Sequence, residues 1–218
     1  MSTKRFATVA ALALLVVTSG CLGVLTGEEA LKLSSEPAAA DATVAADAGY
    51  KTNGTQTLEV NRSFSVAGQE RKVVASNHVT TYEKSLDLGL FGDVKLGVFS
   101  VISTPAVEVA GETLNPIGDY SNDQLVGLIQ SRYQGLSDVE QVSSRNVQVL
   151  GETANVTKYS ATARVKGQTL DVYVHVTKVR HNDDFIVALG LYPQQLGDEE
   201  SNILELMRSV EHPAEAEG

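Results

Sequence analysis

The side chains best suited to transfer protons or bind metals near neutral pH are four histidines. They are His78, His175, His181 and His212. His181 is followed closely by Asp183 and Asp184, and imidazole with carboxylate oxygen is a donor set that suits divalent metals. The same His-Asn-Asp-Asp segment needs no metal to form a hairpin turn, because Asn and Asp tolerate turn geometry, and we prefer the turn. His78 and His175 lie in strand-like segments on polar faces, where a solvated or hydrogen-bonded imidazole is the ordinary role.

No motif connects these histidines to a nucleophile or a cofactor. The sequence contains no G-x-S-x-G turn, no glycine spacing of a phosphate-binding loop, and no EF-hand loop around its acidic clusters. An enzyme would have to use His175 or His181 with a neighbouring acid. We therefore expect a protein without catalytic residues and without a cofactor.

Cys21 is the single cysteine of the chain. It follows Lys4 and Arg5, an uncharged apolar run and a few small residues, which is the order of an export signal. The apolar run is shorter than the ~20 residues that cross a bilayer as a helix. Val17-Thr-Ser-Gly-Cys21 resembles the lipobox of prokaryotic lipoproteins, which implies cleavage between Gly20 and Cys21 and a diacylglyceryl thioether on Cys21. An ordinary signal peptide with a cysteine near its cleavage site is the alternative.

A lipid on Cys21 would hold the protein at the cell membrane on the extracytoplasmic side, since two acyl chains give stable attachment. The full chain has a formal net charge of −10, and loss of the signal removes two basic residues and no acidic ones. That charge repels nucleic acid and anionic headgroups, and the acid excess favours a halophilic protein. We expect the membrane and an envelope protein as partners, no nucleic acid, and a small-molecule ligand that the sequence does not define.

Three asparagines match the N-glycosylation pattern Asn-x-Ser/Thr. They are Asn53, Asn61 and Asn155. The pattern matters only in a host that glycosylates exported proteins. Asn53 is the best candidate, because it lies in the stretch with the weakest secondary-structure pattern.

Composition divides the chain into four segments. These are a lipoprotein signal peptide (1–20), a lipidated N-terminus with a stalk or short helix (21–55), a single α+β domain (56–212) and a frayed C-terminus (213–218). The stalk is favoured by the Ala-, Asp- and Thr-rich composition. The helix is favoured because Asp41 can cap a run of good helix formers, and we prefer it.

Hydrophobic periodicity predicts the elements of the domain. Alternation, β-branched composition or, for 185–192, a run that is apolar on both faces predicts strands over 56–66, 72–84, 95–104, 145–150, 156–166, 169–180 and 185–192, with Val107 and Val109 as an extension of the third. A helical period predicts helices over 121–134 and 198–210, the first with Ser121 and Gln124 spaced as a capping box. Sequential neighbours joined by short turns indicate an α+β fold, a mostly antiparallel sheet of about six to seven strands with two or three packed helices.

The strand over 169–180 shows the clearest alternation. Val172 and Val174 point one way, whereas Asp171, Tyr173 and His175 point the other. A pocket over this polar face would be the natural site for a solute or a metal.

Several short blocks together resemble a family of haloarchaeal lipoproteins of unknown function. They are Cys21–Gly27, Tyr82–Lys84, Ser103–Pro105, Asn115–Gly118, Gly190–Pro193 and Glu211–His212. The resemblance implies an extracytoplasmic lipoprotein and supplies no activity or substrate. We therefore favour a non-catalytic surface binding or envelope module. A lipoprotein that binds a small solute or a metal is the alternative, and a hydrolytic enzyme is the third hypothesis.

Overall fold

The predicted strands form one large, mostly antiparallel sheet in the computed structural model, which describes residues 30–66, 69–87, 93–109, 112–113, 115–132, 135–165 and 167–215. Within these residues the main sheet has eight strands, in the order β1-β4-β5-β11-β10-β9-β8 with β3 paired to β4. They are β1 (Leu31–Ser34), β3 (Lys51–Val66), β4 (Gln69–Asp87), β5 (Asp93–Pro105), β8 (Leu136–Val149), β9 (Glu152–Val165), β10 (Gln168–His181) and β11 (Asp184–Pro193). The predicted α+β class is confirmed, with more strands than the six to seven expected.

The described residues fall into two compact units, one within residues 30–33 and 59–75, the other within residues 34–58 and 76–215. The groove and the histidines discussed below belong to the second unit. That unit also contains two small strand pairs. They join β2 (Ala39–Ala40) to β12 (Val210–Glu211) and β6 (Glu108–Val109) to β7 (Glu112–Thr113).

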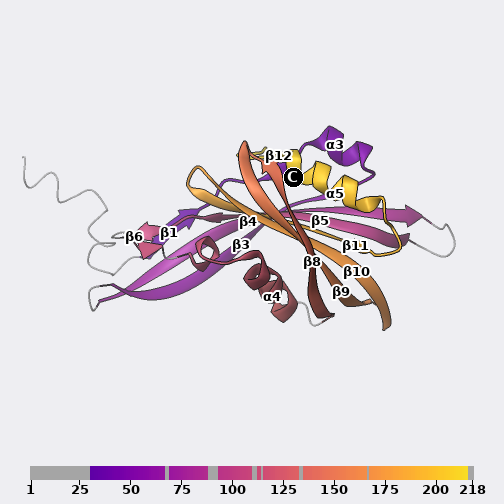
Figure 1. The fold of residues 1–218 in the computed structure, drawn as a ribbon. Coiled ribbons are helices and arrows are strands. Elements are labelled where there is room, and N and C mark those ends of the chain that lie inside the picture. Colours follow the sequence, from indigo (N-terminus) through magenta and orange to yellow (C-terminus); the bar gives the residue numbers. More distant parts are fainter. Residues whose placement is uncertain are drawn as a thin grey trace, which may run out of the picture. The chain divides into compact units, whose positions relative to one another are not determined.

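Helices cover both faces of the sheet in the second unit (Figure 1). On one face lie α3 (Ala42–Asp47) and α5 (Glu199–Arg208), and on the other lies α4 (Asn122–Arg132). Ile203 and Leu206 of α5 are fully buried in one apolar cluster with Phe99 of β5. Leu125 of α4 belongs to a second cluster, with Val174 of β10. The sheet therefore has a separate apolar core on each face.

Local sequence signals explain where the helices begin. The Asp41 side chain accepts a hydrogen bond of 2.9 Å from the Val44 N–H and caps α3, so this stretch is the helix rather than the stalk. At α4 the Gln124 side chain accepts from the Ser121 N–H at 2.9 Å, and the Ser121 hydroxyl accepts from the Gln124 N–H at 3.3 Å. This reciprocal pair is the predicted capping box.

Several element boundaries differ from the predictions. β8 is much longer than the predicted 145–150. Most of this edge strand is exposed on both sides, so its sequence lacks the apolar alternation from which a strand is predicted. Val109 pairs in β6 instead of extending β5, and Val210 leaves α5 to pair with Ala40. The β12–β2 pair joins segments that are distant in sequence, and the β6–β7 pair is a very short hairpin. Neither produces a hydrophobic period in the sequence.

Candidate functional site

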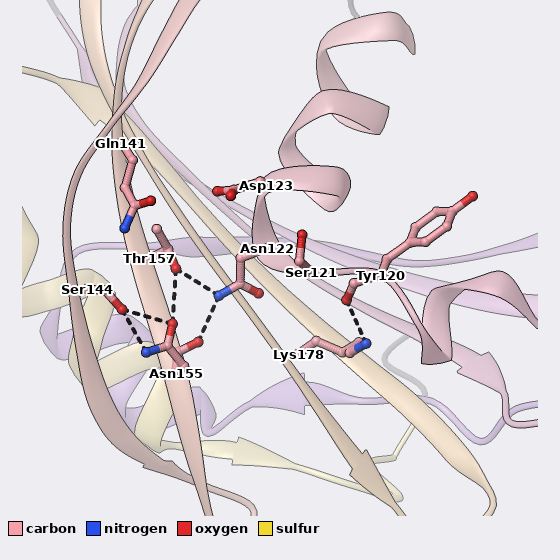
Figure 2. A pocket seen from close by; sticks show the side chains of 9 residues that line it. All are labelled: Tyr120, Ser121, Asn122, Asp123, Gln141, Ser144, Asn155, Thr157 and Lys178. Carbon is pink, nitrogen blue, oxygen red and sulfur yellow. Dashed lines mark hydrogen bonds between the residues drawn. The ribbon is translucent and has the colours of Figure 1, made fainter.

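A hollow of about 370 Å³ opens between the first turn of α4 and strands β8, β9 and β10 (Figure 2). Its lining residues are mostly neutral and polar: Tyr120, Ser121, Asn122, Asp123, Gln141, Ser144, Asn155, Thr157 and Lys178. A second hollow of about 320 Å³ shares Asp123 and Gln141 with the first and continues along α4. It is lined further by Val126, Gly127, Gln130, Val139 and Tyr159. Because they share two residues, we treat the hollows as one site, the α4–β8 groove.

Hydrogen bonds fix the polar floor of the groove. The Asn122 side-chain amide donates to the Asn155 carbonyl and to the Thr157 hydroxyl, both at 2.9 Å. The Asn155 side chain donates to the Ser144 hydroxyl at 2.6 Å and accepts from the Thr157 hydroxyl at 3.1 Å. Figure 2 shows this network joining α4 to β8 and β9. These groups are therefore held in position without a ligand.

The cationic group of the groove is already engaged. The Lys178 ammonium donates to the carbonyls of Ile117 at 2.7 Å, Gly118 at 2.6 Å and Tyr120 at 2.8 Å. An ammonium has three N–H donors, so this interaction uses all of them. Burial lowers the pKa of Lys178. Lys178 thus anchors the 3-10 turn η2 (Pro116–Gly118) and the start of α4 to β10.

Two groups at the junction of the hollows are partly free. Asp123 accepts a hydrogen bond of 2.6 Å from the Tyr159 hydroxyl through Oδ1, and burial, followed by this hydrogen bond, raises the pKa of Tyr159. The other carboxylate oxygen of Asp123 has no hydrogen bond to the described residues. Gln141 is exposed and its carboxamide also lacks such a bond. Figure 2 shows Gln141 on β8 and Asp123 on α4, on opposite walls of the groove.

The polar face of β10 lies elsewhere and is buried at His175, although Asp171 near the start of the strand is exposed. His175 is only 1% exposed, and its Nε2 lies 3.1 Å from the Tyr192 hydroxyl. Burial lowers the pKa of His175 to about 4, so the imidazole is neutral near pH 7. α5 covers this face, with Ile203 packed against Gly190, the cross-strand partner of His175. The sequence could not show this cover, so the expected polar face is part of the core.

Two of the candidate metal ligands, His181 and Asp184, are linked through His212, whereas Asp183 interacts elsewhere. The Nδ1 atom of His181 lies 3.0 Å from Nδ1 of His212, and Nε2 of His212 lies 3.0 Å from Oδ2 of Asp184. Asp184 also accepts from the Glu36 N–H at 2.8 Å, and burial raises its pKa. Asp183 contributes its backbone carbonyl to the Ala106 N–H. Among the described residues, no three His, Cys, Asp or Glu side chains are grouped so that they could hold a metal ion.

All three sequon asparagines are exposed, and all lie in strands. Asn53 and Asn61 belong to β3, so the expectation that Asn53 is in an irregular stretch is wrong. Asn155 belongs to β9 and lines the groove. Gly20 and Cys21 lie outside the described residues. In the part of the chain that is described, no helix has the length and apolar character needed to cross a membrane.

The fold and groove describe an α+β domain, and comparison with known families identifies it further. Residues 37–211 match the domain of unknown function DUF6517, so the chain belongs to the DUF6517 family. No protein with a curated description matches the sequence.

Two solved structures share a distant similarity with the chain. The solution structure of cyanobacterial PsbP (CyanoP) from Synechocystis has a TM-score of 0.40 and 13% identity, over 81% of this chain and 92% of that one. The crystal structure of PA94 from Pseudomonas aeruginosa, a protein of unknown function described as a putative regulator, has a TM-score of 0.33 and 12% identity, over 65% and 89%.

Proposed function

We propose that this protein is a lipid-anchored, extracytoplasmic binding module that holds a polar ligand in the α4–β8 groove without transforming it. The observation that carries the proposal is the groove itself, a concave site lined by neutral amides and hydroxyls that are fixed by their own hydrogen bonds. Converging polar groups in a concave site are the usual mark of ligand binding.

The state of the ionisable groups in the groove supports binding rather than catalysis. Lys178 has all three donors engaged by backbone carbonyls. Asp123 is hydrogen-bonded to Tyr159, and no histidine is among the residues that line the groove. General acid–base chemistry needs a positioned group that can exchange a proton.

The proposed anchor rests on the first residues of the chain. The segment Val17 to Cys21 has the lipobox pattern, and the cysteine has no other cysteine to pair with. The acidic composition suits a protein that works in concentrated salt, in line with the resemblance to haloarchaeal lipoproteins. The lipid would keep the domain at the outer surface of the membrane, where its ligand would be found.

The anchor is tested with the full chain and its Cys21→Ser variant, expressed in an organism that processes lipoproteins. We expect the wild-type protein to partition into the detergent phase and to begin at a diacylated Cys21 by mass spectrometry. The variant should remain in the aqueous phase. An unmodified Cys21 in the mature wild-type protein would disprove the anchor.

Ligand binding is tested by thermal unfolding of the full chain at high salt with neutral sugars, amino acids, short peptides, organic anions and divalent cations. A ligand that binds only the folded state raises Tm. We expect one of these classes to do so, and Gln141→Ala to reduce the shift. If no class raises Tm, or if the shift is the same in Gln141→Ala, the groove is not the binding site.

A further inference from the structure

We infer that the ligand of the α4–β8 groove is a saccharide. This inference rests on the proposed function and adds the chemical class of the ligand. Three observations carry it: the hydrogen-bonding character of the free groups, the mixed polar and apolar lining of the second hollow, and a sequon asparagine inside the groove.

The free groups in the groove favour a ligand that donates hydrogen bonds and carries no negative charge. The free carboxylate oxygen of Asp123 can only accept, whereas the Gln141 carboxamide both donates and accepts. An anionic ligand would be repelled by Asp123 and would find no free N–H on Lys178. A hydroxyl both donates and accepts, so neighbouring hydroxyls of one ligand can satisfy both walls at once.

The second hollow has a mixed lining next to these polar groups. Val139, Gly127 and Tyr159 give it some apolar surface, Gln130 adds a second carboxamide, and Val126 lies buried behind it. A sugar ring has hydroxyls around its edge and C–H groups on its faces, so it presents both kinds of surface to such a site. The hollow therefore suits a ring whose face lies on α4.

Gly127 is a glycine that packing does not demand. It lies inside α4 and its backbone is helical, and a Cβ atom placed on it would meet no atom within 4 Å. Glycine inside a helix costs ~1 kcal/mol relative to alanine. A role in leaving space for a ligand explains why a helix former is absent here.

Asn155 places a potential glycan in the same groove. Its side chain is exposed and hydrogen-bonded to Ser144, and it belongs to the sequon Asn155-Val-Thr157. The first sugar of a glycan on Asn155 would lie within the groove. The saccharide could thus come from the chain itself or from another molecule of the cell envelope, and the chemistry of recognition is the same.

The source is distinguished by two arms of one experiment on the full chain. In the first, glycopeptides of the protein from its native host are analysed by mass spectrometry, and endoglycosidase cleavage is timed for the folded and unfolded protein. In the second, the chain made in a host without N-glycosylation is titrated with neutral mono- and disaccharides by saturation-transfer NMR and calorimetry.

Two groove variants and a matched control sharpen both arms. Gly127→Leu fills the second hollow with a good helix former, and Gln141→Ala removes the free carboxamide. Gln148→Ala removes the same residue type from the same strand outside the groove, where it contacts Thr153 of the β8–β9 hairpin. We expect each groove variant to weaken saccharide binding at least tenfold, or to expose an Asn155 glycan to cleavage, and Gln148→Ala to do neither.

The outcomes separate this inference from the proposed function. A glycan on Asn155 that is protected only in the folded wild-type protein supports the intrachain source. Binding of an added sugar that depends on Gly127 and Gln141 supports an external source. If there is neither a protected glycan nor variant-sensitive sugar binding, the saccharide inference is wrong. Should another ligand class still raise Tm in a Gln141-dependent manner, the proposed function stands, and if none does, both are wrong.

Discussion

On the face of the sheet covered by α5, polar side chains lie in the core and bind one another, whereas on the face covered by α4 they line an open groove. Glu199 is 5% exposed and its carboxylate lies 2.8 Å from the Lys84 ammonium. Gln141 is exposed and makes no side-chain hydrogen bond to the described residues. Similar polar chemistry thus serves stability on one face and is available to a ligand on the other.

Glu200 shows how polar groups on the α5 face are paired with one another. Glu200 lies 2.7 Å from both Lys158 and Arg145. Burial of Glu200 disfavours its charge, but the hydrogen bond and charge of Lys158 outweigh this, and the net pKa is lowered. The Lys158 ammonium also lies 3.7 Å from the ring centre of Tyr173, within cation–π distance. A polar cluster that is buried and paired thus stabilises the fold, whereas a polar cluster that is held in place but exposed can bind a ligand.

The largest effect on stability is expected on the α5 face. Lys84→Met leaves the Glu199 carboxylate buried without its partner, and such a loss lowers the free energy of unfolding by about 3–5 kcal/mol. Lys95→Met is the control, because Lys95 pairs with Glu83 on the surface and an exposed pair contributes only about 0–1 kcal/mol. Urea unfolding measures both. Equal losses would show that the buried pair has no special role.

A pH-dependent effect is expected from His175 on the same face. Its pKa is lowered from 6.5 to about 4 by burial, so between these values the unfolded chain binds more protons than the folded one. The free energy of unfolding should therefore fall by up to about 3 kcal/mol as the pH drops from about 6.5 to about 4. His175→Gln should show a smaller fall in urea titrations over this range. An unchanged slope in the variant would contradict the assignment to His175.

A smaller loss is expected on the α4 face, with a clear effect on binding. Asn122→Ala removes two hydrogen bonds to β9 and should lower the free energy of unfolding by about 1–2 kcal/mol. It should also lower the affinity for the ligand found in the binding screen more than tenfold. Asn77→Ala, which removes a hydrogen bond to the Leu58 carbonyl outside the groove, should leave affinity unchanged. Loss of stability without loss of affinity would make the Asn122 network purely structural.

The smallest expected effect has the opposite sign. Gly127→Ala should raise the free energy of unfolding by up to ~1 kcal/mol, since alanine favours the helix and its Cβ meets open space. Gly97→Ala should instead destabilise, because a Cβ there would overlap the Tyr50 hydroxyl. Thermal unfolding compares the two variants. A destabilising Gly127→Ala would show that this position is needed for packing, and the argument from open space would fail.

The sequence by itself determined the elements whose signals are local. Alternation predicted β10, because side-chain direction in a strand has a period of two. A run of residues that are apolar on both faces predicted β11. The Asp41 cap and the Ser121–Gln124 capping box were also predicted, since each involves residues three apart in sequence. The three sequons and the acidic charge likewise need no structure.

Only the tertiary structure decided which polar residues are buried and which form a site. The period of β10 cannot show that α5 covers His175, and β8 has no apolar period because it is an edge strand. The groove combines the start of α4 with parts of three strands, and those segments meet only through strand pairing and the anchoring of the α4 turn by Lys178. Backbone geometry fixes a local pattern, but the cover over a face depends on packing between segments far apart in the chain.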